Sequence, residues 1–134
     1  MIFLGDSLTA GRGLPADAAF PALVAEMSRE KGRPLRVVNA GVSGDTTSGG
    51  LDRLGWLLEQ KPDVLVVGLG VNDAFRGQPV DRIEANLRAD RGAGEGGGAR
   101  VVLLGMRVPT NYGPEYTEAF AAIYPASRRR KAWT

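Results

Sequence analysis

Residues 64–69 read Val-Leu-Val-Val-Gly-Leu, an apolar run rich in β-branched residues. A run of this kind, without alternating polar residues, is typical of a strand buried on both faces of a parallel sheet. Three more runs share this character, at Ile2 to Leu4, Leu35 to Val38 and Val101 to Leu104. We therefore expect four buried strands, whose following loops begin at one edge of the sheet.

Helical patterns separate these runs. Apolar residues at helical spacing predict helices over Phe20 to Lys31, Leu51 to Gln60 and Glu115 to Tyr124. Pro79 suits the first turn of another helix, which begins after it. Strict alternation of strand and helix predicts an α/β fold, a three-layer sandwich built around a parallel sheet.

Two places depart from this alternation. Residues 92–98 contain five glycines, and each costs about 1 kcal/mol relative to alanine inside a helix, so we expect the helix after Pro79 to stop near Asp90. After Pro125 no further apolar strand or closing helix follows. We expect one incomplete domain over residues 1–125 and a basic tail over residues 126–134.

The absence of two residue types excludes several kinds of catalytic and structural site. The 134 residues include no histidine and no cysteine, which excludes disulfides, thiol nucleophiles, Ser-His relays and the usual zinc sites, and we expect no metal or cofactor. The basic run Arg128 to Lys131 has no interleaved aromatic residues and predicts a solvated terminus with no nucleic-acid partner. No apolar stretch approaches the ~20 residues of a membrane span, and no signal peptide is evident, so we expect a cytoplasmic protein.

The first loop places a serine just beyond a buried strand. Residues 5–11 read Gly-Asp-Ser-Leu-Thr-Ala-Gly. Thr9 stands where a G-x-S-x-G elbow needs its second glycine, and the G-K-[ST] ending of a P-loop is missing. Ser7 can present its hydroxyl at the sheet edge, or it can cap a helix.

The next two loops offer hydrogen-bond donors. Residues 39–47 read Asn-Ala-Gly-Val-Ser-Gly-Asp-Thr-Thr; the glycines permit close backbone approach to a ligand, and Asp45 or Thr46 can cap the next helix. Residues 68–73 begin like a dinucleotide fingerprint, but Asp73 takes the place of the third glycine. The carboxamide of Asn72 is a group that can help to build an oxyanion hole.

Together, the G-D-S-L, N-A-G-x-S-G-D-T and G-x-N-D blocks, in this order and spacing, resemble the GDSL or SGNH hydrolase family, in particular its bacterial arylesterase and multifunctional thioesterase/lysophospholipase branch. The likeness extends through residues 107–113 and 116–125. It implies a flavodoxin-like SGNH hydrolase fold that here lacks its last strand and helix. Full-length members of the branch are often periplasmic or secreted.

The resemblance implies roles for single residues. Ser7 would be the nucleophile toward an ester or thioester carbonyl, and the Ser7 N–H, the Gly44 N–H and the Asn72 side chain would form the oxyanion hole. Asp6 and Asp73 would support the loops by accepting backbone hydrogen bonds. The expected substrates are small acyl esters, thioesters or lysophospholipids, and the residues that would line their cleft are Phe75, Arg76, Pro109, Asn111 and Tyr112.

One block of the family pattern is missing. The family's C-terminal D-x-x-H supplies the general base, whereas this chain has no histidine. Our preferred hypothesis is an N-terminal hydrolase fragment whose reading frame changes near Pro125. The alternatives are a relative that binds acyl or ester ligands without turnover, and a nucleotide-binding module that holds Mg²⁺ through Asp6 and Asp73.

Overall fold

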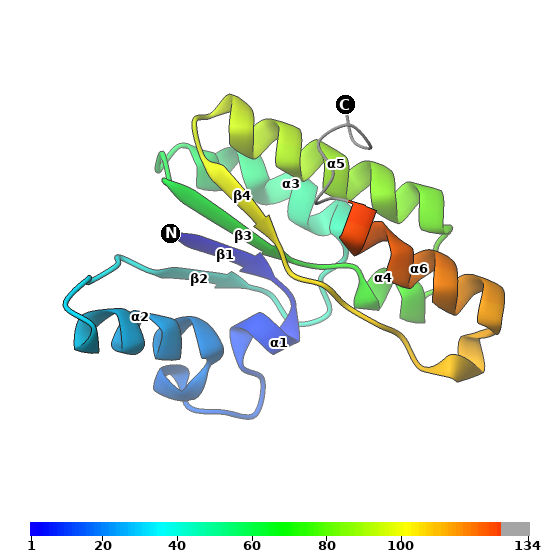
Figure 1. Ribbon diagram of the computed structural model, residues 1–134, viewed down its shortest axis with the longest axis horizontal. Coiled ribbons are helices and arrows are strands. Elements are labelled where there is room, and N and C mark those ends of the chain that lie inside the picture. Colours follow the sequence, from blue (N-terminus) through cyan, green and yellow to red (C-terminus); the bar gives the residue numbers. More distant parts are fainter. Residues whose placement is uncertain (127–134) are drawn as a thin grey trace.

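The computed structural model describes residues 1–126, in which a parallel sheet lies between layers of helices (Figure 1). The strand order is β2-β1-β3-β4, and each neighbouring pair is parallel. The predicted α/β sandwich is therefore confirmed. The strands are β1 (Ile2–Gly5), β2 (Val38–Gly41), β3 (Val64–Gly68) and β4 (Arg100–Leu103).

Helices cover both faces of the sheet. In Figure 1, α3 and α5 lie on one face, α1 and α2 lie on the other, and α4 and α6 lie beyond the ends toward which the strands point. The three longer helices predicted from apolar spacing and the helix after Pro79 are all present. The helices are α1 (Ser7–Ala10), α2 (Phe20–Glu30), α3 (Thr47–Leu58), α4 (Val71–Phe75), α5 (Val80–Gly96) and α6 (Pro114–Ala126), with short 3-10 turns η1 (Ala16–Ala18) and η2 (Thr110–Tyr112).

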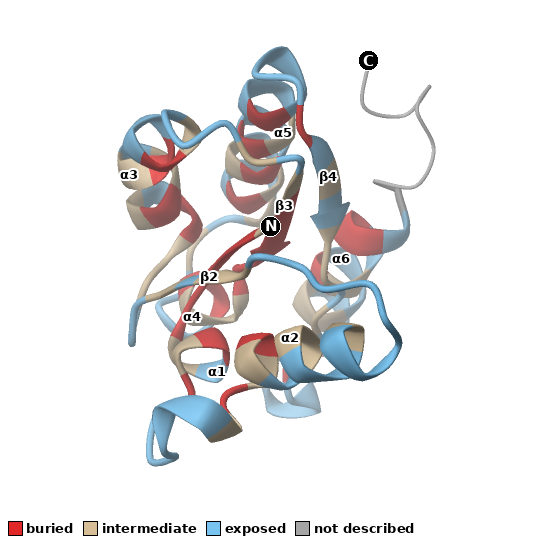
Figure 2. Cartoon of the chain, turned by 90° about the vertical axis from the view of Figure 1, so that its left-hand side faces the viewer, coloured by how far each residue is buried: buried red, intermediate tan, exposed pale blue. Residues whose placement is uncertain are grey.

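The core is centred on the two inner strands. Every residue of β1 and nearly every residue of β3 is buried (Figure 2). Their side chains belong to one core cluster with buried leucines of α3 and α5 such as Leu54 and Leu87. The expectation of burial on both faces is wrong for β2 and β4. Each of these has a strand on one side only, and Val102 of β4 is 41% exposed.

The second strand begins three residues later than its apolar run predicts. Residues 35–37 are irregular, and β2 starts at Val38, which stands opposite Ile2 at the beginning of β1. The apolar residues before Val38 have no partner in the register of β1 and β2. Leu35 is accordingly 44% exposed. Pairing with β1, rather than local hydropathy, sets this boundary.

The predicted end of α5 near Asp90 is also wrong, because the helix continues through the glycines to Gly96. Gly94 is buried where α5 packs on the sheet, and a Cβ there would lie 2.6 Å from a methyl group of Val101 and 3.1 Å from one of Leu65. The absent side chain allows the helix to approach β3 and β4 closely. This packing offsets the helix-propensity cost of glycine.

Two further expectations concern the surface and the terminus. Within residues 1–126, no helix is long and apolar enough to cross a membrane. Of the basic tail predicted over residues 126–134, Ala126 is the last residue of α6, and the rest, with the run Arg128 to Lys131, lies outside the described residues.

Candidate active site at the carboxyl edge of the sheet

Strand register brings the three predicted loops to one edge. Gly5 at the end of β1 is paired with Gly41 of β2 on one side and with Gly68 of β3 on the other. The chain runs from β1 outward to β2 and then returns to the opposite side of β1 to form β3. Ligands of doubly wound folds bind where the strand order reverses in this way. The loops that carry Ser7, Gly44 and Asn72 surround this reversal.

Ser7 is the first residue of α1 and is half-buried. The preceding residue, Asp6, caps this helix, and its Oδ1 accepts a hydrogen bond from the Leu8 N–H at 3.0 Å. The alternative in which Ser7 itself caps a helix is therefore wrong. Asp6 is fully buried, and burial raises the pKa of its carboxyl group. The cap holds the turn that carries the serine.

The loop after β2 is exposed at Gly44, where φ is +80°. This left-handed conformation favours glycine and sets the direction of the neighbouring peptide groups. Thr46 then caps α3, and its hydroxyl accepts a hydrogen bond from the Gly49 N–H at 3.2 Å. Of the two caps considered from the sequence, Thr46 is the one that the structure contains. Arg76 donates to the Gly44 carbonyl oxygen at 3.1 Å.

Asn72 lies in α4, a short helix that the sequence did not predict. Its Nδ2 donates to the backbone oxygen of Asp45 at 3.0 Å. The amide nitrogen carries two N–H groups, and this bond uses one of them. The side chain is thus held against the loop that contains Gly44.

Asp73 binds Thr47, the residue at which this loop enters α3. Asp73 is 2% exposed, and its two carboxylate oxygens accept hydrogen bonds from the Thr47 backbone N–H at 2.8 Å and from the Thr47 hydroxyl at 2.6 Å. Asn86 of α5 donates to the same hydroxyl at 2.9 Å. No sequence pattern indicated Thr47 or Asn86. Their contribution depends on tertiary contacts between α3, α4 and α5.

The nucleotide and Mg²⁺ alternative receives no support from these contacts. Both carboxylate oxygens of Asp73 already accept hydrogen bonds, and residues 1–126 contain no group of three or more metal-ligating side chains. Gly70, which completes the fingerprint-like G-x-G, instead leaves space for the hydroxyl of Tyr124. That hydroxyl donates to the Leu69 carbonyl at 3.0 Å, and burial raises its pKa.

The two predicted walls of the substrate cleft meet at an aromatic contact. The rings of Phe75 and Tyr112 are 6.0 Å apart between centroids, although the side chains are 52% and 37% exposed. Pro109 and Asn111 are exposed beside Tyr112, at and within η2. The structure therefore brings the two segments together, with apolar rings exposed toward solvent.

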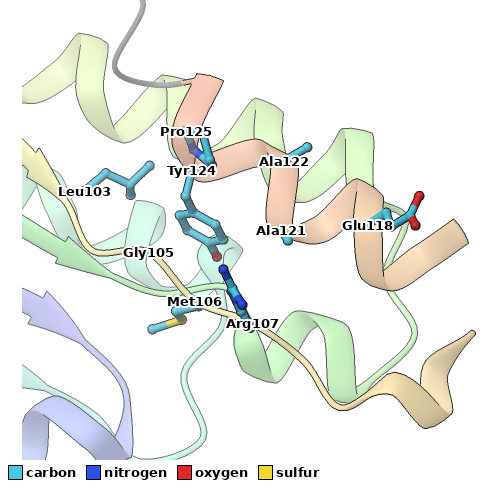
Figure 3. Close-up of a pocket in the computed structure, with 9 residues that line it drawn as sticks. All are labelled: Leu103, Gly105, Met106, Arg107, Glu118, Ala121, Ala122, Tyr124 and Pro125. Atoms are coloured by element: carbon cyan, nitrogen blue, oxygen red, sulfur yellow. The ribbon is translucent and has the colours of Figure 1, made fainter. Parts of the chain in front are cut away.

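A separate cavity of about 730 Å³ lies between the segment after β4 and the last turns of α6 (Figure 3). None of the predicted site residues lines it. It belongs to the β4 edge of the molecule and not to the reversal of strand order. The residues that line it are Leu103, Gly105, Met106, Arg107, Glu118, Ala121, Ala122, Tyr124 and Pro125.

Two charged residues near the site were not predicted. Arg53 of α3 forms an ion pair with Asp45 at 2.8 Å. Asp90 of α5 is fully buried, and within residues 1–126 neither carboxylate oxygen has a hydrogen-bond partner. Burial raises the pKa of Asp90 to about 7, with the charge of Asp45 adding to the shift and that of Arg53 opposing it.

Comparisons with known proteins agree with this geometry. Residues 3–133 match the model of the GDSL-like lipase/acylhydrolase family. Esterase TesA of Pseudomonas aeruginosa is 42% identical over 127 residues, which are 94% of this chain and 63% of that protein. Thioesterase 1/protease 1/lysophospholipase L1 of Escherichia coli K12 is 44% identical over 126 residues, 93% of this chain and 59% of that protein.

A solved structure gives the same result. The crystal structure of AlinE4, described as an SGNH-hydrolase family esterase, superposes with a TM-score of 0.89 at 38% identity, over 92% of this chain and 67% of that one. The chain thus spans about three-fifths of the length of the two relatives named above. Relatives named as esterases and thioesterases favour the hydrolase hypothesis over the ligand-binding and nucleotide-binding alternatives.

Proposed function

Because the chain belongs to the GDSL-like lipase/acylhydrolase family, we propose that its carboxyl-edge site takes carboxylic esters or thioesters, with Ser7 as the nucleophile. The observation that carries this proposal is the level register of β1, β2 and β3, together with the hydrogen bond from Asn72 to the backbone of Asp45. These contacts support a hydroxyl nucleophile and oxyanion donors at one edge of the sheet.

In the proposed reaction, the Ser7 Oγ attacks the carbonyl carbon, the alcohol or thiol leaves, and water hydrolyses the resulting acyl-enzyme. The backbone N–H groups of Ser7 and Gly44 and the side-chain amide of Asn72 donate to the oxyanion of the tetrahedral intermediate. Preorganised donors of this kind act where charge develops, and removing one costs about 10² to 10³ in kcat.

The proton of Ser7 determines how fast this chain can react. The chain contains no histidine, so no imidazole of its own accepts that proton. In a serine protease, loss of the base lowers kcat by about 10⁶ and leaves about 10³ to 10⁴ over water from the oxyanion hole and binding. We therefore expect slow acylation by activated esters and weak turnover.

The cleft supports small acyl substrates. Phe75 and Tyr112 offer exposed apolar rings to an acyl chain, and Arg76 lies beside them against the Gly44 loop. Pro109 and Asn111 are proposed to complete the wall. We propose small esters, thioesters or lysophospholipids as substrates, which the names of the relatives support.

The test is acylation by p-nitrophenyl butyrate, followed by peptide mass spectrometry. We expect a butyryl group on Ser7 in the parent chain and no label at that position in Ser7→Ala. Asn72→Ala should acylate about 10²-fold more slowly, because one oxyanion donor is lost. The initial release of p-nitrophenol gives the rates.

Ser43→Ala is the matched control, since Ser43 is an exposed serine on the loop after β2 with no proposed role. It should react like the parent. A rate of p-nitrophenol release that is unchanged in Ser7→Ala would contradict the assignment of the nucleophile.

A further inference from the structure

Arg53 links two loops that are far apart in the sequence. Its Nε and Nη2 donate to the same carboxylate oxygen of Asp45 at 3.0 and 2.8 Å, and Nη2 also donates to the Gly5 carbonyl at 3.1 Å. The Arg53 side chain is 26% exposed and that of Asp45 is 11% exposed. One largely buried guanidinium therefore holds the end of β1 and the loop after β2 together.

Both ends of this link lead to the proposed reacting groups. Gly5 is the last residue of β1 and precedes Asp6 and Ser7. Asp45 directly follows Gly44, and its backbone oxygen accepts the hydrogen bond from Asn72. The guanidinium thus connects the nucleophile loop to Asp45, which follows Gly44 in the chain and binds Asn72 through its backbone oxygen.

This ion pair differs from others in the described chain. Arginine presents its donors in a rigid planar fork, so its contacts fix orientation as well as distance. The other pairs link residues three or four apart on one helix and cannot position one loop against another. They are Arg29–Glu26, Arg88–Glu84 and Arg91–Glu95.

We propose that Arg53 is a positioning residue of the ester site, which sets the spacing between the Ser7 loop and the Gly44 and Asn72 donors. This inference rests on the proposed function. Oxyanion donors act only when they lie about 2.7 to 3.1 Å from a common point. A displacement of about 1 Å can cost about 10²-fold in rate, so a clamp on both loops has a kinetic effect.

The kinetic test measures phosphonylation of Ser7 by a p-nitrophenyl alkylphosphonate, in which Oγ attacks phosphorus, p-nitrophenolate leaves and the proton goes to water. Arg53→Gln removes the charge and the fork, whereas Arg53→Lys keeps only the charge. Arg29→Gln is the matched control, because it breaks an ion pair on α2 whose arginine is 68% exposed.

We expect Arg53→Gln to lower the limiting rate of phosphonylation by about 10- to 100-fold with little change in the half-saturating concentration. The limiting rate of Arg53→Lys should lie between those of Arg53→Gln and the parent, and the limiting rate of Arg29→Gln should equal that of the parent. A purely structural role would lower the unfolding temperature of Arg53→Gln but leave the limiting rate of the folded protein unchanged, and this result would overturn the inference.

Amide hydrogen exchange gives a readout that does not depend on reactivity. The Val42 N–H donates at 3.0 Å to the Gly5 carbonyl that Arg53 also contacts. In Arg53→Gln we expect its exchange to accelerate about tenfold or more relative to amides of β3, and in Arg29→Gln we expect no change.

The two readouts separate the two proposals. If the parent is not phosphonylated at Ser7 but Arg53→Gln still loosens the loop, the proposed function fails, and Arg53 is left with a structural role as the link between the two loops. If the parent reacts and Arg53→Gln reacts equally fast with unchanged exchange, only the positioning role fails.

Discussion

Helices α3 and α5 pack side by side on the same face of the sheet, yet they are held in different ways. At α3, the buried polar groups are paired: Thr46 caps the helix, Thr47 donates twice to Asp73, and Arg53 binds Asp45. At α5, no side chain caps the first turn, and Asp90 has no hydrogen-bond partner within the described residues.

The difference follows where the polar groups lie along each helix. The polar contacts of α3 lie in its first two turns, directly behind the Gly44 loop, where they orient hydrogen-bond donors. The interior of α5, in contrast, is held by the packing of its buried residues Ile83, Leu87 and Gly94. Paired polar groups specify one arrangement, whereas an unpaired buried carboxyl group lowers stability without orienting anything.

The largest expected effect concerns Asp90. Its pKa is about 7 in the folded chain against an ordinary value of 3.8, so between these pH values the folded state retains a proton that the unfolded state has released. Protonated Asp90 therefore contributes to the free energy of unfolding. This contribution is fully present below about pH 4 and is lost as the pH rises to about 7. This contribution amounts to about 4 kcal/mol.

Asp90→Asn removes this titration and nearly preserves the shape of the side chain. The measurement is urea unfolding of both proteins from pH 4 to pH 8, and the difference between them cancels the other titrating groups that they share. We expect the free energy of unfolding of Asp90→Asn to increase progressively relative to that of the parent as the pH rises. A difference that does not vary with pH would show that Asp90 titrates normally.

A smaller effect is expected where α3 is held. Asp73→Ala leaves the buried N–H and hydroxyl of Thr47 without their acceptor, which should lower the free energy of unfolding by about 3 kcal/mol. The acylation rate of Ser7 should also fall, because the Gly44 loop loses its support. Urea unfolding at pH 7 measures the first effect, and the p-nitrophenyl butyrate assay measures the second.

Asp52→Ala is the control for this change, since Asp52 lies on α3 but is exposed. It should stay within about 0.5 kcal/mol of the parent. Equal stability of Asp73→Ala and Asp52→Ala would contradict the view that the buried hydrogen bonds of Asp73 hold α3.

The smallest effect tests the glycines of α5. Gly94→Ala should destabilise by about 1 kcal/mol, because the cost of crowding Val101 and Leu65 exceeds the gain in helix propensity. Gly92→Ala meets nothing within 4 Å and should stabilise by about 1 kcal/mol. Thermal unfolding of both variants measures the difference. A stabilising Gly94→Ala would mean that the helix does not approach the sheet closely.

The alternation of elements was predictable because it depends on local patterns. Runs such as Val64 to Leu69 and the leucines of α3 have the spacing of their secondary structure. The start of β2 and the end of α5 were not predictable in this way. The first depends on which residue stands opposite Ile2, and the second on the space left by Gly94 against the sheet.

The candidate site divides similarly. Ser7, Gly44 and Asn72 stand directly after strands, in loops whose order and spacing resemble a known family, so the sequence indicated them. Arg53 lies within an ordinary amphipathic helix, and its neighbours Asp45 and Gly5 are brought to it only by the fold. A side chain that acts by joining distant segments leaves no local pattern.

The register of the neighbouring strands β1, β2 and β3 has a consequence for the depth of the cleft. Since β1, β2 and β3 end level with one another, only the lengths of the connecting segments determine how far each group extends. Ser7 lies two residues past β1, Gly44 three past β2 and Asn72 four past β3. Deleting one residue between Gly41 and Gly44 would withdraw that donor by up to about 3.5 Å, whereas lengthening all three strands equally would move the whole arrangement outward intact.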